Sequence, residues 1–103
     1  MQVNAFRMKL KPGFEAEYKK RHDEIWPELK ELLQRAGIAE YYIFLDEATG
    51  SLFAFQKIAP TDSALTLPEQ PVMRRWWGYM ADIMEVNADH SPVAVPCSEV
   101  FRL

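Results

Sequence analysis

A chain of 103 residues can bury one hydrophobic core, and we expect a single domain over residues 1–103. The formal net charge is −3, and no cluster of basic residues marks a nucleic-acid-binding surface. The single cysteine, Cys97, excludes an internal disulfide, and no apolar run approaches the length of a membrane span. We therefore expect a cytoplasmic protein without a nucleic-acid or membrane partner.

The first half of the chain predicts a strand, a broken helix and a hairpin. Apolar and polar residues alternate over 2–10, as they do in a half-buried strand. Apolar residues then recur at helical spacing over 14–35, and Pro27 should kink or interrupt this helix because proline has no backbone N–H. Two apolar stretches, 41–45 and 52–58, flank a polar turn and predict a hairpin.

The second half predicts a loop, a helix and a last strand. Prolines and small polar residues make 59–70 the least regular segment, and we expect a loop with one helical turn. Pro71 suits the first position of a helix, whose apolar stripe continues to Met84. The composition of 87–92 indicates a loop, and a fourth strand should lie within 93–103.

This order of elements, βαββαβ, predicts an α+β fold of the ferredoxin-like type. With right-handed crossovers, it gives an antiparallel four-stranded sheet with both helices on one face. The strands over 41–45 and 52–58 are apolar on both faces, so the face without helices should not remain in water. We expect a homodimer in which a second chain packs against this face.

A candidate site lies on the broken helix. Tyr18 and His22 are four residues apart, so their side chains are neighbours on its apolar face. A helix break at Pro27, beside an inward histidine, should open a pocket there. The pKa of an ordinary histidine, about 6.5, suits proton transfer near neutrality. A histidine on an apolar stripe is more often structural, however, so spacing alone leaves both roles open.

Three aromatic residues elsewhere suggest a second part of this site. Trp76 and Trp77 are adjacent and point about 100° apart on a helix, so we expect one in the core and the other in a pocket wall. Indole rings stack on the apolar face of a sugar, and the indole N–H can donate to a hydroxyl group. Tyr41, at the start of a strand, could equally be a core residue or a binding residue.

Several sequence blocks recur in order over nearly the whole chain, and together they resemble the L-rhamnose mutarotase family. The blocks are Glu17-Tyr18, Arg21-His22, Ile25-Trp26-Pro27-Glu28-Leu29, Tyr41, Leu45-Asp46, Arg75-Trp76-Trp77, Tyr79-Met80, Asp82, Ser91-Pro92-Val93 and Glu99-Val100-Phe101. Two features depart from the family pattern: the stretch 60–71 is richer in proline, and His90 stands where the family more often has Asn.

The resemblance implies a homodimeric α/β barrel that interconverts the α and β anomers of L-rhamnose without a metal or an organic cofactor. It implies that His22 is the proton donor, and that Tyr18, Tyr41, Trp76 and Trp77 bind the sugar. Ring opening also needs a base that accepts the proton of the anomeric hydroxyl. The sequence does not decide whether this base is water, Tyr18 or a carboxylate.

Two other classes of function fit the same fold. Small dimeric α/β barrels also host cofactor-free oxygenases and haem-degrading enzymes, since a fold does not by itself set a function. A non-catalytic sugar-binding module would bind the ligand but leave anomer exchange at its spontaneous rate.

Overall fold

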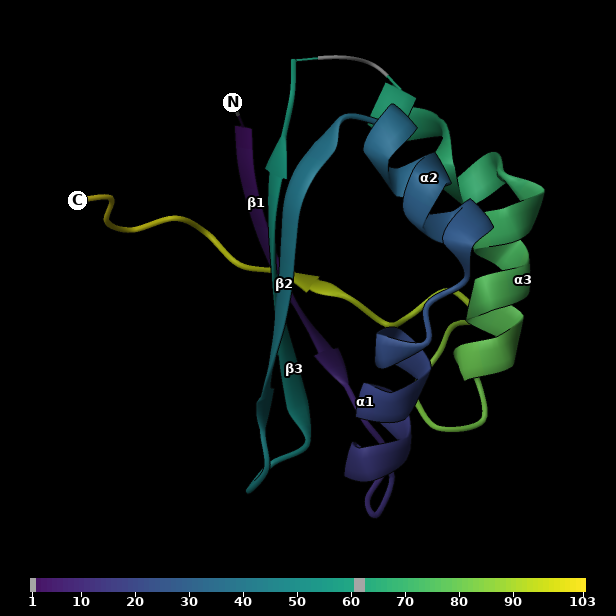
Figure 1. Cartoon of the computed structure of the whole chain (residues 1–103). Helices are drawn as coiled ribbons and strands as arrows, with labels where there is room; N and C mark the ends of the chain where they lie inside the picture. Colours follow the sequence, from purple (N-terminus) through teal and green to yellow (C-terminus); the bar gives the residue numbers. More distant parts are fainter. Residues whose placement is uncertain (1, 61–62) are drawn as a thin grey trace.

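A sheet and a layer of helices face each other in the computed structural model, which describes residues 2–60 and 63–103 (Figure 1). The strands are β1 (Gln2–Lys9), β2 (Ile38–Asp46), β3 (Ser51–Ile58) and β4 (Val95–Pro96). The helices are α1 (Glu15–Asp23), α2 (Pro27–Arg35), the 3₁₀ helix η1 (Ser63–Glu69) and α3 (Pro71–Met80).

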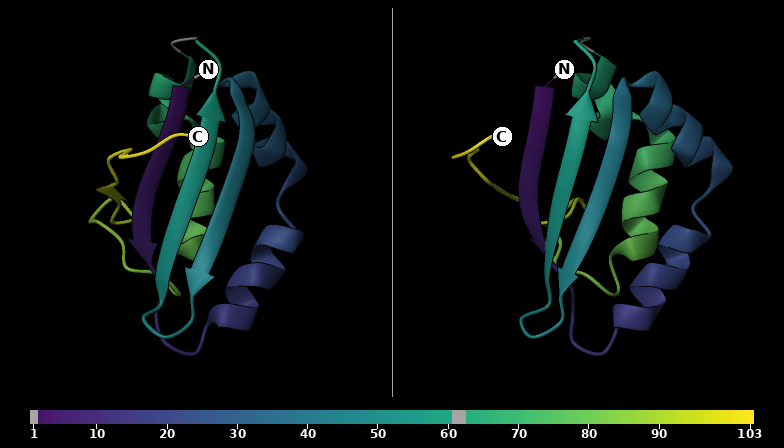
Figure 2. Two further views of the ribbon diagram at one scale, coloured as in Figure 1. Left: turned by 90° about the vertical axis from the view of Figure 1, so that its left-hand side faces the viewer. Right: turned by 60° about the vertical axis from the view of Figure 1, so that its left-hand side comes forward.

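The strand order is β2-β3-β1-β4, and each pair of neighbours is antiparallel. The helices cover one face of this sheet and leave the other bare, as two further views show (Figure 2). The predicted α+β fold, with four antiparallel strands and helices on one face, is confirmed.

The predicted helix break at Pro27 is confirmed. Helix α1 ends at Asp23, and α2 begins at Pro27 after an extended Trp26 with a ψ of 129°. The carbonyl of Trp26 accepts hydrogen bonds from the backbone N–H groups of Leu29 and Lys30, so α2 starts anew with its own first turn. Two short helices therefore replace one long helix.

Two predictions for the second half needed correction. Helix α3 ends at Met80, not Met84, and Met84 instead forms an antiparallel bridge with Leu10. The segment 59–70 contains a 3₁₀ helix of 7 residues rather than a single helical turn, although residues 61–62 lie outside the described part. The predicted fourth strand is confirmed, and it has 2 residues, Val95 and Pro96. Apolar spacing cannot separate a helix from a buried turn that follows it.

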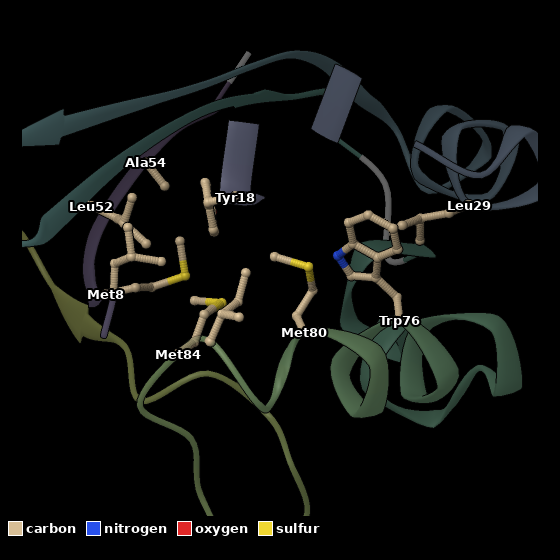
Figure 3. Packing of buried hydrophobic residues seen from close by; sticks show 10 residues of the cluster. Met8, Tyr18, Leu29, Leu52, Ala54, Trp76, Met80 and Met84 are labelled. Atoms are coloured by element: carbon tan, nitrogen blue, oxygen red, sulfur yellow. The ribbon is translucent and has the colours of Figure 1, made fainter. Parts of the chain in front are cut away.

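The core lies between the sheet and the helices (Figure 3). Leu52 and Ala54 of β3 are fully buried and face the helices, which contribute Leu29 from α2 and Trp76 from α3. Since side chains alternate along a strand, the next residues of β3 point to the bare face.

The bare face is aromatic. Tyr42 and Phe44 of β2 lie beside Phe53 and Phe55 of β3, and Phe44 is 58% exposed. The C-terminal segment passes to this side of the sheet, away from the helices, and exposes Val100, Phe101 and Leu103 (Figure 1). Within the described residues, no helix is long and apolar enough to cross a membrane.

One departure from the family pattern has a conformational explanation. His90, in the loop before Ser91, has a φ of 70°. Asn, Asp and His are enriched among non-glycine residues in this left-handed region. His90 therefore fits the conformation that the loop requires.

Candidate active site

A cavity of about 1280 Å³ lies between the sheet and the helices. A smaller cavity of about 70 Å³ shares part of its lining. All the residues that the sequence analysis singled out for the site line both cavities: Tyr18, His22, Tyr41, Trp76 and Trp77. Side chains from α1, β2 and α3 thus meet around one space.

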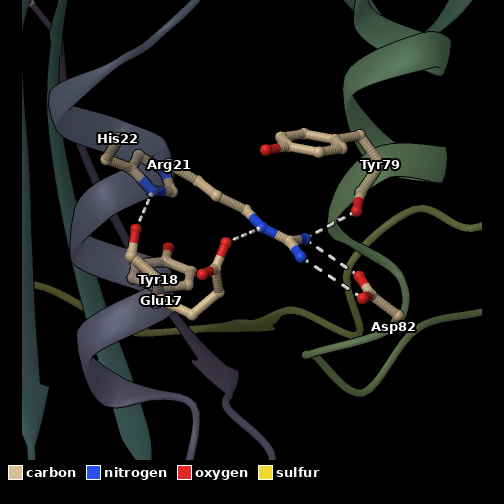
Figure 4. Close-up of polar contacts among 6 residues, drawn as sticks. All are labelled: Glu17, Tyr18, Arg21, His22, Tyr79 and Asp82. Atoms are coloured by element: carbon tan, nitrogen blue, oxygen red, sulfur yellow. Dashed lines mark hydrogen bonds and ion pairs between the residues drawn. The ribbon is translucent and has the colours of Figure 1, made fainter.

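Helix α1 places Tyr18 and His22 side by side. They are one helical turn apart, and their ring centroids are 4.3 Å apart. The Nδ1 atom of His22 lies 3.0 Å from the backbone carbonyl oxygen of Tyr18 (Figure 4). A carbonyl oxygen only accepts, so Nδ1 carries the hydrogen and donates it. The other ring nitrogen, Nε2, is therefore left to exchange a proton with a ligand.

The surroundings of His22 favour the uncharged imidazole. Burial lowers its pKa below the ordinary value of 6.5, whereas the hydrogen bond to the Tyr18 carbonyl and the charge of Asp23 raise it. The indole of Trp76 meets the imidazole edge-on, with ring centroids 5.5 Å apart. His22 is thus a weaker base, and its protonated form a stronger acid, than a histidine in water.

Both tyrosines of the cavity keep their protons at neutral pH. Burial, together with the nearby Tyr41, raises the pKa of Tyr18 well above its usual range. Burial also raises the pKa of Tyr41 to about 12, although a side-chain hydrogen bond with Gln56 opposes this shift. Two neutral hydroxyl groups therefore face the cavity as hydrogen-bond donors. This finding argues against Tyr18 as the base at neutral pH.

The two tryptophans divide as expected, with Trp76 in the core and Trp77 in the cavity wall, but Trp76 borders the cavity as well. Trp76 is only 6% exposed and belongs to the core, yet it lines the cavity together with the partly buried Trp77. The ring of Trp26, from the break between α1 and α2, packs edge-on against Trp76 with centroids 5.1 Å apart. Trp76 is thus held on one side while it borders the cavity on the other.

Gln56 is a cavity residue that the sequence analysis missed. It is paired with Tyr41 across β2 and β3, and the two side chains are hydrogen-bonded. The sequence does hold a signal, because Gln56 follows Leu52 and Ala54 at alternating positions of β3. A polar residue in a row of core-facing positions indicates a lined cavity.

The sequence analysis assigned no role to Arg21 or Asp82, which it named only in the blocks that resemble the family. In the structure, the Arg21 guanidinium bonds Asp82 beyond the end of α3, next to His22 (Figure 4). The two residues are 61 positions apart in the chain, so only the fold brings them together.

Over residues 2–60 and 63–103, no three His, Cys, Asp or Glu side chains are grouped as a metal site requires.

Two solved structures resemble this chain over nearly its whole length. The crystal structure of L-rhamnose mutarotase from Formosa agariphila is 48% identical, with a TM-score of 0.93 over 100% of this chain and 99% of that one. A Mycobacterium tuberculosis protein of 9% identity, with a TM-score of 0.57 over 97% of this chain and 95% of that one, shares the fold alone.

Curated relatives are equally similar. The L-rhamnose mutarotase of Bacteroides thetaiotaomicron is 52% identical, and that of Sinorhizobium fredii 54%, each over 100% of this chain and 99% of the relative. The family model described as L-rhamnose mutarotase matches residues 4–103. The chain therefore belongs to the L-rhamnose mutarotase family.

Proposed function

We propose that this protein interconverts the α and β anomers of L-rhamnose, as an isomerase. The proposal is carried by the relatives named L-rhamnose mutarotase, to which the whole chain is 52% and 54% identical. The meeting of Tyr18, His22, Tyr41, Trp76 and Trp77 around one cavity supports it. Neither an oxygenase, a haem-degrading enzyme nor a passive sugar-binding module gains support from a specific observation. A cytoplasmic location stays a prediction.

The cavity suits an uncharged polar ligand. Trp76 and Trp77 offer apolar ring surface for the C–H groups of a sugar, and Tyr18 and Tyr41 offer hydroxyl groups. Because the pKa values of both tyrosines are raised, no phenolate charge has to be desolvated when the sugar enters. We assign sugar binding to these residues.

In the proposed reaction, the imidazolium form of His22 delivers its Nε2 proton to the ring oxygen while the anomeric hydroxyl gives its proton to water or to a carboxylate. The bond between the ring oxygen and the anomeric carbon breaks, and an open-chain aldehyde forms. Rotation of the aldehyde and reclosure from its other face give the second anomer, and His22 recovers its proton. A positioned general acid or base contributes a rate factor of roughly 10² to 10⁴.

The hydrogen bond from Nδ1 to the Tyr18 carbonyl supports this role for His22. It fixes the plane of the imidazole and leaves Nε2 as the atom that exchanges the proton. The proton of the anomeric hydroxyl passes to water or to a carboxylate, since the raised pKa of Tyr18 keeps its hydroxyl protonated and leaves no phenolate to accept a proton at neutral pH.

We also propose that two chains form the homodimeric α/β barrel through their bare sheet faces. The exposed aromatic residues Tyr42, Phe44, Phe53 and Phe55 form the contact surface in this proposal. The C-terminal segment carries Val100 and Phe101 on the same side of the sheet. One chain thus offers an apolar face and an apolar segment that a second copy can match reciprocally.

Tryptophan fluorescence should report sugar binding. L-rhamnose entering the cavity displaces water from Trp77, so a saturating titration should change the emission of the wild-type protein. Trp77→Phe should lose most of this change, whereas Trp26→Phe, which removes an indole outside the set assigned to the sugar, should keep it. No change in the wild-type emission or in its indole N–H chemical shifts would contradict the assignment of the tryptophans.

His22→Ala should abolish most of the rate enhancement and leave sugar affinity nearly unchanged, because proton transfer acts in the transition state. Exchange between the anomers, measured by saturation-transfer NMR, checks the rate. His22→Gln should be little better than His22→Ala, since an amide forms hydrogen bonds but delivers no proton.

Thermal unfolding of the same preparations is the control for a structural histidine. Leaving a buried partner unpaired costs about 1 to 3 kcal/mol and lowers the melting temperature. A His22→Ala protein that melts earlier but exchanges anomers at the wild-type rate while folded would remove His22 from the mechanism.

The pH dependence should reflect the lowered pKa of His22. If the imidazolium is the donor, kcat/KM should fall as the pH rises, with an inflexion below 6.5, because burial makes the ring lose its proton earlier. The spontaneous exchange rate is subtracted at each pH, and His22→Gln should lack the inflexion. A rate that rises with pH through the same inflexion would instead make His22 the base.

Light scattering should show a dimer at micromolar concentration. Phe44→Glu places a charge in the centre of the aromatic face and should shift the protein to a monomer, because a carboxylate is costly to bury. Gln34→Glu adds the same charge on α2 and should leave the dimer intact. A wild-type monomer would refute the proposed assembly.

A further inference from the structure

The site depends on two helices that are far apart in the sequence. Helix α1 contributes Tyr18 and His22, and α3 contributes Trp76 and Trp77. With 9 residues, α1 is too short to be stable alone, and Tyr18 is its one buried residue. The core packing of α1 therefore depends on Tyr18, and contacts outside the core can add to what sets the position of α1 relative to α3.

Arg21 makes such contacts. Its Nη1 and Nη2 atoms lie 2.9 Å and 3.3 Å from the two carboxylate oxygens of Asp82. Nη1 also donates to the Tyr79 carbonyl at 2.7 Å, and the guanidinium carbon lies 4.4 Å from the centre of the Tyr79 ring. Nε donates to Glu17 at 2.7 Å on its own helix (Figure 4). The Arg21 side chain is only 11% exposed.

These acceptors belong to the C-terminal end of α3. The Tyr79 carbonyl is one of the last carbonyls of the helix, which lack partners within it and carry partial negative charge. Asp82 stands in the turn that follows. A planar guanidinium that binds a carboxylate through two bonds fixes orientation as well as distance. Arg21 thus joins α1 to α3 in one defined geometry.

The link that Arg21 makes between α1 and α3 lies directly beside His22, the proposed proton donor. Arg21 precedes His22 in α1, and the Trp76 ring that His22 contacts lies 5.7 Å from the Tyr79 ring that Arg21 covers. A rotation or shift of α1 would move Nε2 of His22 relative to a ligand held against the α3 tryptophans. A misplacement of about 1 Å can cost a factor of about 10² in rate.

We propose that Arg21, through Asp82 and Tyr79, is a positioning residue that holds His22 at its working distance from the sugar. The inference rests on the proposed role of His22 as proton donor. It assigns no contact with the sugar to Arg21. Among the other ion pairs of the described helices, Lys19 with Asp23 lies within α1, and Arg75 with Glu28 joins α3 to α2, so neither links α1 to α3.

Arg21→Met tests this role, since methionine keeps apolar bulk but loses every polar contact. We expect kcat to fall by about 10²-fold while KM changes less than about threefold, because the binding groups remain and the donor is misplaced. Arg21→Lys keeps the positive charge but loses the planar guanidinium that bonds both carboxylate oxygens, so its kcat should lie between those of Arg21→Met and the wild type. Lys20→Met removes a charge from an exposed neighbouring position and should retain the wild-type kcat.

Asp82→Asn supplies a second variant of nearly unchanged shape, in case Arg21→Met does not fold. It should lower kcat in the same direction. NMR cross-peaks between the His22 ring protons and the Trp76 indole protons should weaken in both variants at temperatures well below unfolding. A merely stabilising ion pair would lower the melting temperature and leave these cross-peaks and kcat unchanged.

The outcomes separate the two proposals. Full activity in folded Arg21→Met or Asp82→Asn, combined with loss of activity in His22→Ala, would overturn the positioning role alone. Full activity in His22→Ala would overturn the proposed role of His22, and with it the inference for Arg21.

Discussion

The ring of Pro27, which clashes with a helical Trp26 and leaves no backbone N–H, is the constraint on which the arrangement of the site depends. It forces Trp26 into an extended conformation and divides one amphipathic segment into α1 and α2. Leu29 can then enter the core from α2 while Tyr18 does so from α1, at a different angle. The freed Trp26 ring packs on Trp76 and Tyr79, and so ties the break to α3.

Burial has a single effect on the titratable groups of the cavity, although their pKa values move in opposite directions. It lowers the pKa of His22 and raises those of Tyr18 and Tyr41, because in each case it disfavours the charged form. At neutral pH these three side chains are therefore uncharged. An uncharged sugar thus meets uncharged polar groups in the predominant form of the site, and the lowered pKa makes the imidazolium of His22, the form that donates from Nε2, a stronger acid.

Local physical rules carried the sequence analysis furthest. Alternation, helical spacing and the geometry of proline act within a few residues, so they predicted the hairpin and the break at Pro27. The end of α3 was missed because Ile83 and Met84 are as buried as helical core residues while lying beyond the helix. The short β4 was not foreseeable, since where a strand stops pairing depends on its neighbour in the sheet.

The site could be predicted only in part, because local patterns do not show which distant residues the fold brings together. The pair Tyr18 and His22 is a local pattern, but its meeting with Tyr41 and the tryptophans followed from the family resemblance rather than from spacing. The link from Arg21 to Asp82 spans 61 positions and needs the fold itself. Charged residues on short helices are abundant, so the sequence could not single out Arg21 as one whose side chain is only 11% exposed.

The sheet separates the two surfaces on which the proposals rest. Leu52 and Ala54 face the helices and the core, whereas Phe53 and Phe55 face the opposite side, because neighbouring side chains alternate. The cavity residues lie on the helical side, so a partner on the aromatic face would not occupy the space proposed for the sugar. Assembly and catalysis can then be altered independently. Each subunit of the proposed dimer would hold a complete set of the assigned residues, which is consistent with so short a chain supplying the whole site.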